Sequence, residues 1–106
     1  MVQITQEVLN EITQRIVESL HPLRIYEFGS RAYGTPHPDS DLDLMLVFPD
    51  DDCRRIDLVC AARQLLRALP FGIDVLVRFR SEFDSRAEWP TTIEATVKHK
   101  GRLLHG

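Results

Sequence analysis

The stretch from Ile25 to Phe48 constrains this chain more than any other. It holds two apolar segments with strand character, a Gly29-Ser30 pair where the first segment ends, and Asp41 and Asp43 two positions apart in the second. Side chains alternate across a strand, so these two carboxylates project from the same face. Carboxylates held side by side repel each other unless a cation joins them. The pattern therefore indicates a cation site.

Length and composition fit one small domain spanning residues 1–106. The formal net charge of −3 argues against a protein whose main role is to coat nucleic acid or an anionic membrane. Neither a signal peptide nor a transmembrane segment is present, so a cytoplasmic protein is expected. Cys53 and Cys60, expected about 10 Å apart on one helix, are too distant for a disulfide and are interpreted as small apolar residues.

Hydrophobic periodicity predicts alternating helices and strands. One helix is expected to begin in the acidic run Asp50–Asp52, because acids suit the positive end of the helix dipole, and to bury Ile56 and Cys60. Thr91 and Glu94 have the spacing of a capping box and predict the start of the last helix. The expected elements are helices over 5–20, 51–69, 81–88 and 91–100, strands over 23–28, 41–48, 72–77 and 102–104, and one helical turn over 31–33 followed by an extended connection.

Asp74 interrupts the third of these strands, which is otherwise apolar on both faces, as expected for an interior strand. Burying an unpaired carboxylate is costly, so Asp74 calls for a functional reason. Trp89 stands beside Pro90, where packing and contact with a partner are both open. Together the elements predict an α/β (α+β) domain, a small sheet covered by helices in two or three layers.

Jointly, Gly29-Ser30, Asp41-x-Asp43 and Asp74 resemble the signature of the nucleotidyltransferase superfamily typified by DNA polymerase β, and specifically its minimal members. The resemblance covers essentially the whole chain. It implies a polymerase β-like fold, in which a small mixed sheet is flanked by helices. The sequence departs from the pattern at Tyr33, where relatives have a second basic residue. Because basic side chains bind phosphate, this departure affects how tightly the chain is expected to bind triphosphate.

The resemblance also implies the roles of these residues. Nucleotidyl transfer from ATP requires two Mg²⁺ ions to neutralise developing charge, and carboxylates suit this hard cation. Asp41 and Asp43 are expected to bridge both ions, and Asp74 to complete the site near the attacking hydroxyl. Gly29 lets the backbone approach phosphate, Ser30 offers a hydroxyl and an N–H, and Arg31 is a candidate for binding the triphosphate, with stacking on Tyr33 as the alternative.

Small members of this branch are usually antitoxins paired with a helical HEPN ribonuclease toxin. The resemblance implies that the chain transfers AMP from ATP to a tyrosine of such a partner, without direct binding of nucleic acid. One alternative is a non-catalytic antitoxin that occludes the toxin, and another is nucleotidyl transfer to a small molecule. A lone domain of this length has no room for an acceptor-binding domain, which favours an acceptor held on a partner's surface.

Overall fold

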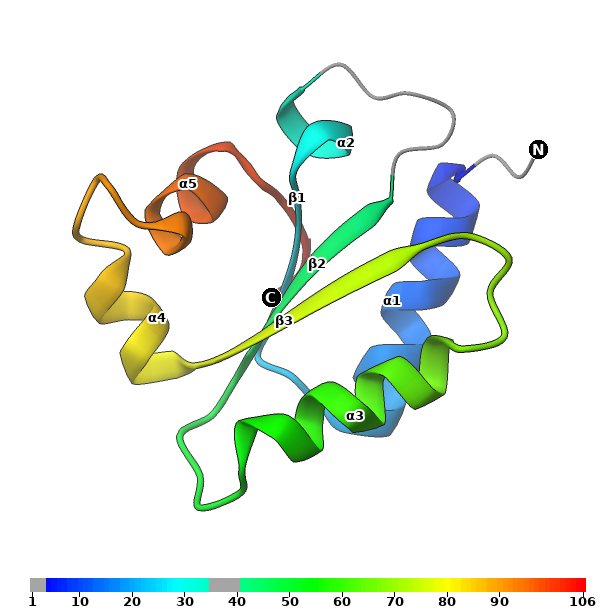
Figure 1. The fold of residues 1–106 in the computed structure, drawn as a ribbon, viewed down its shortest axis with the longest axis horizontal. Coiled ribbons are helices and arrows are strands. Elements are labelled where there is room, and N and C mark those ends of the chain that lie inside the picture. The colour runs from blue at the N-terminus through cyan, green and yellow to red at the C-terminus, as the bar shows by residue number, and fades with distance from the viewer. Residues whose placement is uncertain (1–3, 35–40) are drawn as a thin grey trace.

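A mixed β-sheet lies between two pairs of helices in the computed structural model, which describes residues 4–34 and 41–106 (Figure 1). In these residues the sheet has four strands in the order β3-β2-β1-β4; β2 is parallel to β3 and antiparallel to β1, and β4 is antiparallel to β1. The extended connection expected before Asp41 falls outside the described residues. The elements are α1 (Gln6–Leu20), β1 (Arg24–Phe28), α2 (Ser30–Tyr33), β2 (Leu42–Phe48), α3 (Arg55–Leu66), β3 (Ile73–Phe79), α4 (Arg80–Arg86), α5 (Ile93–Lys100) and β4 (Arg102–His105).

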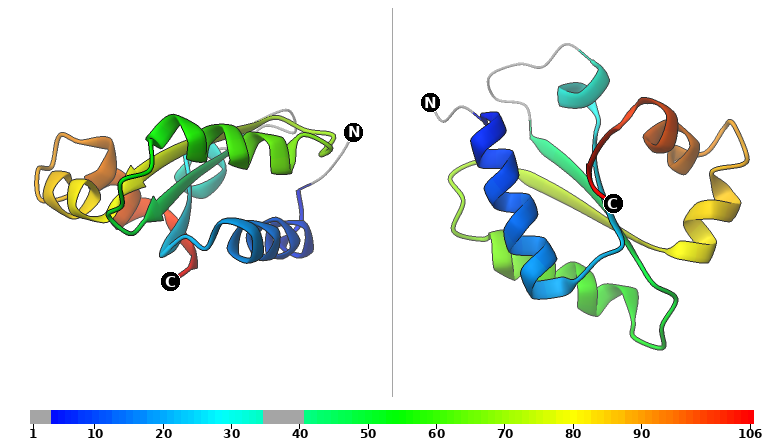
Figure 2. Two further views of the ribbon diagram at one scale, coloured as in Figure 1. Left: turned by 90° about the horizontal axis from the view of Figure 1, so that it is seen from below. Right: turned by 180° about the vertical axis from the view of Figure 1, so that it is seen from behind.

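The central strand β2 sends alternate side chains into two separate cores. Leu42, Leu44 and Leu46 pack on α1 and α3, while Met45 and Val47 pack on the face that α4 and α5 cover. Figure 1 shows these helix pairs on opposite sides of the strands, and the right panel of Figure 2 shows α1 passing beside α3. The prediction of a mixed sheet flanked by helices is therefore confirmed.

The first helix follows the sequence closely. The side chain of Thr5 caps α1 by accepting a hydrogen bond from the Val8 N–H at 3.3 Å. The helix ends at His21, which adopts a left-handed conformation with φ of 55°, and the buried Pro22 follows it. None of the helices in residues 4–34 and 41–106 is both long and apolar enough to cross a membrane.

The helix predicted over 51–69 is shorter at both ends, because α3 covers only Arg55–Leu66. The acidic run before it does not start the helix. Instead Asp50 accepts hydrogen bonds from the Ser81 N–H, at 3.1 Å, and from the Ser81 hydroxyl. These bonds tie the loop after β2 to the start of α4, so a tertiary contact replaces the expected interaction with the helix dipole.

Two residues expected on the buried side of this helix are exposed. Ile56 is 56% exposed and Cys60 is also exposed, because α3 packs on the sheet through the stripe of Ala62 and Leu66. At 100° per residue, positions 56 and 60 lie more than 100° away from Ala62 around the helix. Cys53 precedes α3 rather than lying on it, and it is also free and exposed. The prediction that Cys60 is buried was wrong, and so was the placement of Cys53 on the helix.

Among the strands of residues 4–34 and 41–106, β3 lies at the edge of the sheet and pairs with β2 alone, contrary to the interior position expected for it. Its apolar pattern has another cause: Val75 and Val77 pack against the α1 and α3 side, and Leu76 packs towards α4. Asp74 is exposed on this strand, so the cost of a buried carboxylate does not arise. The reason for an acid at this position must come from its neighbours.

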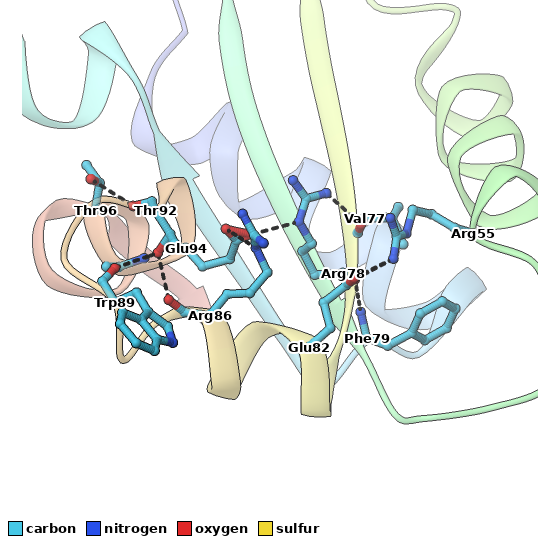
Figure 3. Close-up of polar contacts among 11 residues, drawn as sticks. Arg55, Val77, Arg78, Phe79, Glu82, Arg86, Trp89, Thr92, Glu94 and Thr96 are labelled. Carbon is cyan, nitrogen blue, oxygen red and sulfur yellow. Dashed lines mark hydrogen bonds and ion pairs between the residues drawn. The ribbon is translucent and has the colours of Figure 1, made fainter.

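The capping box expected at Thr91 and Glu94 does not form. Thr92 is the N-cap of α5, and its hydroxyl accepts a hydrogen bond from the Ala95 N–H at 3.1 Å. Glu94 is fully buried and turns towards β3 and α4, where it pairs with Arg78 and Arg86 (Figure 3). Glu94 therefore forms long-range ion pairs in place of the capping interaction that its spacing from Thr91 predicted.

Candidate active site

Three aspartates meet at the beginning of β2 and β3. Asp43 and Asp74 are partners in the parallel ladder, and they share the face of the sheet on which Met45 and Leu76 lie. Asp41 stands directly before β2, two positions from Asp43 and therefore towards the same face. The structure thus brings together the three acids that the sequence analysis selected.

Asp43 lies among other carboxylates that repel its charge. Burial, then the charge of Asp74 and a hydrogen bond between the two side chains, raise the pKa of Asp43 to about 6. The charges of Asp41 and Glu27 act in the same direction. The neighbouring carboxylates thus add to the effect of burial and surround Asp43 with negative charge. The site is therefore electrostatically prepared for a cation.

Two glycines leave room for the aspartate side chains. A Cβ atom on Gly29 would overlap the Asp43 carboxylate and lie 3.0 Å from its Cγ, and Gly29 has a positive φ of 78°. A Cβ on Gly72 would overlap the Asp41 carboxylate and lie 2.7 Å from its Cγ. Gly72 also accepts a hydrogen bond from the Leu42 N–H at 3.0 Å, which aligns the starts of β2 and β3. The sequence analysis gave Gly72 no role, although a glycine directly before a strand is a visible signal.

Ser30 is exposed and opens α2, the single helical turn beside the aspartates. The N–H groups of Ala32 and Tyr33 bond back to the Gly29 carbonyl at 3.1 and 3.2 Å. The first N–H groups of a helical turn have no partner within the turn, so those of Ser30 and Arg31 are the ones suited to an anion. Gly29 thus allows a phosphate to approach the backbone closely, and the N–H groups at the start of α2 supply hydrogen-bond donors next to Asp43.

Arg31 lies apart from this cluster. Its guanidinium donates a hydrogen bond from Nη2 to the Ile4 carbonyl at 3.2 Å, and its Nε is buried without an acceptor among the described residues. The side chain therefore reaches the chain segment before α1. The aromatic–cation contacts in the described residues involve Arg24 and Arg55, so the alternative of stacking on Tyr33 is not what the structure contains.

Glu27 is a fourth acid whose charge acts on Asp43, and sequence reasoning missed it. It projects from the opposite face of the sheet, because its register partner Leu44 packs on the α1 and α3 side. It is only 2% exposed, and its Oε1 lies 3.7 Å from Nη1 of Arg102 without a hydrogen-bond partner among the described residues. It occupies β1 between Tyr26 and Phe28, and Phe28 faces Asp43 in the antiparallel register. An acid inside an apolar strand was the signal used for Asp74, and the same signal was present at Glu27.

The donor set fits a hard divalent cation. Carboxylate oxygens are the ligands that Mg²⁺ prefers, and the raised pKa of Asp43 marks the place where a cation would relieve repulsion. Within residues 4–34 and 41–106, no three His, Cys, Asp or Glu side chains already converge as a ligand cluster. The aspartates therefore lie close enough to influence each other without forming a finished metal site.

Comparisons with known proteins agree with this geometry. The sequence matches the family model of the nucleotidyltransferase domain over residues 8–102. A protein of Sulfolobus solfataricus classed as a nucleotidyltransferase superposes with a TM-score of 0.61 at 23% identity, over 92% of this chain and 76% of that one. No curated protein matches the chain.

Two further solved structures are toxin–antitoxin complexes. A complex with AMP-PNP gives a TM-score of 0.59 at 24% identity, over 92% of this chain and 73% of that one. A variant of the MntA–HepT complex, with two aspartates two positions apart replaced by glutamate, gives 0.57 at 22% identity over the same shares. At these identities the likeness concerns the fold.

The family match spans most of the chain and includes every residue of the site. Gly29 and Ser30, Asp41 and Asp43, and Asp74 all fall within residues 8–102. The expected small mixed sheet flanked by helices is met by the topology, and the two strands that carry the acids, β2 and β3, are neighbours in it. This chain belongs to the nucleotidyltransferase domain family.

Proposed function

We propose that this protein is a Mg²⁺-dependent adenylyltransferase that acts as an antitoxin, transferring AMP from ATP to a tyrosine of a partner toxin of the HEPN ribonuclease class. The observation that carries the proposal is the group of Asp41, Asp43 and Asp74 beside the Gly29-Ser30 turn, where burial together with the charges of the other two aspartates raises the pKa of Asp43 to about 6. Negative charge without a matching cation, next to an anion-binding turn, suits a metal–triphosphate substrate.

Asp41, Asp43 and Asp74 would hold two Mg²⁺ ions, which when bound neutralise charge on the reacting phosphate and on the leaving group. The Gly29-Ser30 turn would orient the triphosphate with the Ser30 hydroxyl and the first N–H groups of α2. Arg31 could bind the triphosphate only if its hydrogen bond to the Ile4 carbonyl were broken. Its binding to triphosphate remains part of the proposal.

In the chemical step the tyrosine oxygen attacks the α-phosphorus of ATP. The new P–O bond forms as the bond to pyrophosphate breaks, and pyrophosphate leaves with the electron pair of that bond. Asp74, placed on the edge strand and exposed, accepts the proton of the tyrosine hydroxyl. The position of Asp74 at the open side of the site leaves the acceptor free to approach from another protein.

The solved neighbours support the choice of nucleotide and partner. One toxin–antitoxin complex of this fold was solved with AMP-PNP, an ATP analogue. Another carries paired Asp→Glu replacements with the same spacing as Asp41 and Asp43. These proteins support ATP as the donor and a toxin as the acceptor for this chain.

The test uses labelled ATP, Mg²⁺ and the product of the adjacent reading frame. The intact protein should label that product on a tyrosine, and the double variant Asp41→Ala with Asp43→Ala should not. Omission of Mg²⁺ should remove labelling as well. If the intact protein transfers no nucleotide from any of the four NTPs, the enzymatic proposal fails.

A second candidate function is neutralisation by binding alone. The observation in its favour is Trp89, which is 67% exposed and offers an anchor to a partner whether or not transfer occurs. Cells expressing the toxin would separate the two functions. The double Asp→Ala variant should fail to protect them if transfer is needed, and should still protect them if occlusion is sufficient.

A further inference from the structure

The connection between α4 and α5 presents apolar side chains to solvent. Trp89, the single tryptophan of the chain, is 67% exposed, and Ile93 and Pro90 beside it are exposed too. A tryptophan gains much free energy when it is buried, so a domain that leaves one exposed forgoes that gain. Exposed tryptophans are enriched at protein interfaces and among the residues that dominate binding energy.

Hydrogen bonds hold this connection in one conformation. The Trp89 N–H donates to the Arg86 carbonyl at 3.0 Å, and the Thr92 N–H donates to the Trp89 carbonyl at 3.1 Å. The Thr92 hydroxyl lies 2.7 Å from the Arg86 carbonyl oxygen and 2.9 Å from that of Trp89, so its proton is shared between them. Figure 3 shows the indole extending away from this network.

A buried ion-pair cluster anchors the same connection to the sheet. The carboxylate of Glu94 lies 3.2 Å from Nε of Arg78 and 3.0 Å from Nε of Arg86, which joins α5 to both β3 and α4 (Figure 3). A side chain displayed on a fixed support loses little conformational freedom on binding. Trp89 is thus preorganised as an anchor.

Charge around the connection differs from the rest of the chain. Residues 86–106 hold four Arg and Lys against two Glu, a formal charge of +2, so the remaining residues carry −5 of the total of −3. Lys100 shares a helical stripe with Ile93. Pro90, His99 and Lys100 line one cavity of about 280 Å³ together with Glu88. An apolar anchor with basic neighbours complements an apolar pocket with an acidic rim.

The connection also lies on the same face of the sheet as the aspartates. Phe83 of α4 stacks on Tyr26 with ring centres 5.5 Å apart, and it packs in the core that contains Val47. Val47 is four residues from Asp43 along β2, about 13 Å at the rise of a strand. The connection between α4 and α5 and the aspartates are therefore both reached from this one face of the sheet.

We propose that Trp89, Pro90, Ile93, His99 and Lys100 form the docking surface for the acceptor protein, which receives the indole in an apolar pocket flanked by acidic side chains. This assignment rests on the proposed function for the identity of the partner. It adds how the acceptor is recognised: α4 and α5 hold it, while the aspartates farther along the same face act on the side chain that it presents.

A protein fits this surface better than a nucleic acid does. Trp89, Pro90 and Ile93 place three exposed apolar groups close together in the chain. A phosphate backbone offers no apolar surface to bury them, whereas a protein pocket does. A protein pocket with acidic side chains at its rim would also meet His99 and Lys100.

The experiment measures the affinity of the intact protein and its variants for the product of the adjacent reading frame. Trp89→Ala should weaken binding at least about tenfold, the scale of an interface anchor. Ile56→Ala is the matched control, because Ile56 is exposed on α3 across the sheet, and it should bind as the wild type does. Lys100→Glu should weaken binding at low salt and approach the wild type at high salt, with Arg63→Glu on α3 as its control.

Transfer kinetics separate docking from chemistry. With Trp89→Ala, KM for the acceptor should rise about tenfold while kcat at saturating acceptor and affinity for ATP stay unchanged. Transfer and binding at wild-type levels by Trp89→Ala would overturn the docking surface and leave the proposed function standing. Affinity is measured directly, so this outcome can be read even if the wild type transfers no AMP, a result that contradicts the proposed function alone.

A third readout needs no substitution that could unfold the protein. The chain can be produced with 5-fluorotryptophan at its one tryptophan, which gives a single fluorine resonance from Trp89. Adding the partner should shift and broaden this resonance. An unchanged resonance in the saturated complex would overturn the proposal, and so would a shift caused by a single-stranded oligoribonucleotide in place of the protein.

Discussion

Glu94 and Asp43 are carboxylates with opposite responses to their surroundings. Glu94 is fully buried, and burial acts to raise its pKa, yet hydrogen bonds, including those from Arg78 and Arg86, and the charge of Arg78 hold the pKa below its ordinary value. Asp43 is less buried, and its pKa rises to about 6 because burial and the charges of the neighbouring acids act in the same direction. Burial raises the pKa of both carboxyl groups, and the hydrogen bonds and arginine partners of Glu94 reverse the direction of its shift.

The two carboxylates therefore have different roles: the charge of Glu94 stabilises the fold, whereas the charges around Asp43 are suited to binding a ligand. The Glu94 cluster closes on itself and fixes α5 against β3 and α4. Asp43, Asp41 and Asp74 leave their repulsion unresolved at an open edge of the sheet, where a proton or an added cation can relieve it. Exchanging or removing members of the two groups should therefore have different consequences, activity in one case and stability in the other.

The largest expected effect is on catalysis at Asp43. Asp43→Asn removes one charged ligand while keeping the shape of the side chain, and AMP transfer should fall about a thousandfold, or about 4 kcal/mol, the scale of losing one electrostatic stabiliser of a transition state. Initial rates with labelled ATP and the partner would measure it. Asp57→Asn, the same change at an exposed position on α3 across the sheet, should keep the wild-type rate. Comparable rates for Asp43→Asn and wild type would remove Asp43 from the catalytic site.

The next effect is on stability at Glu94. Glu94→Gln removes the negative charge and leaves Arg78 largely buried without its counter-ion, so the free energy of unfolding should fall by about 3 kcal/mol. Arg86 is 57% exposed and can turn to water, which keeps the loss at the lower end of the range for buried pairs. Thermal unfolding should show a Tm lower by about 15 °C.

Glu88→Gln is the control for this change, because it removes an exposed glutamate from the same region and should alter stability by less than about 0.5 kcal/mol. Equal Tm values for Glu94→Gln and Glu88→Gln would mean that the buried cluster contributes nothing to the fold.

The pH dependence of stability should have opposite signs at the two sites. The folded pKa of Asp43 lies above its unfolded value, so the folded state holds the extra proton and stability falls as pH rises from about 4 to about 6. A shift of this size corresponds to at most about 3 kcal/mol, and partial exposure reduces it to roughly 1 kcal/mol. Glu94 has a lowered pKa, so its contribution is complete above the unfolded pKa and is lost as pH falls through the folded one.

Urea unfolding of metal-free protein at several pH values tests this. Asp43→Asn should be more stable than wild type above pH 6 and equal to it near pH 4. A constant difference across this range would show that Asp43 has no coupling to the neighbouring acids.

Local spacing in the sequence was enough to find the parts of the site that lie on one segment. Gly29, Ser30, Asp41 and Asp43 are close in the chain, and strand alternation fixes the common face of the two aspartates. Asp74 was found because an acid stands out in an apolar strand. Its position opposite Asp43 depends on the parallel register of β2 and β3, which periodicity does not contain.

Long-range pairing explains what sequence reasoning misjudged. Glu94 has the local spacing of a capping residue, but two arginines from other elements offer it a buried ion pair, and Thr92 takes over the cap. Asp50 likewise bonds to Ser81 rather than opening α3. Glu27 was missed because its importance depends on Asp43 in the neighbouring strand and on Arg102 in the last one.

An exposed ion pair completes the comparison and should show the smallest effect. Glu11 and Arg15 lie one turn apart on α1 with 2.9 Å between Oε1 and Nη2, a shorter distance than in the Glu94 cluster, yet both are exposed. Water and salt screen such a pair, so Glu11→Gln should lower the free energy of unfolding by only about 0.2–0.5 kcal/mol, and by less at high salt. Urea titrations of Glu11→Gln and Glu94→Gln at low and high salt would measure both changes. A loss at Glu11 as large as that at Glu94 would mean that distance, rather than burial and partners, sets the contribution of charge in this protein.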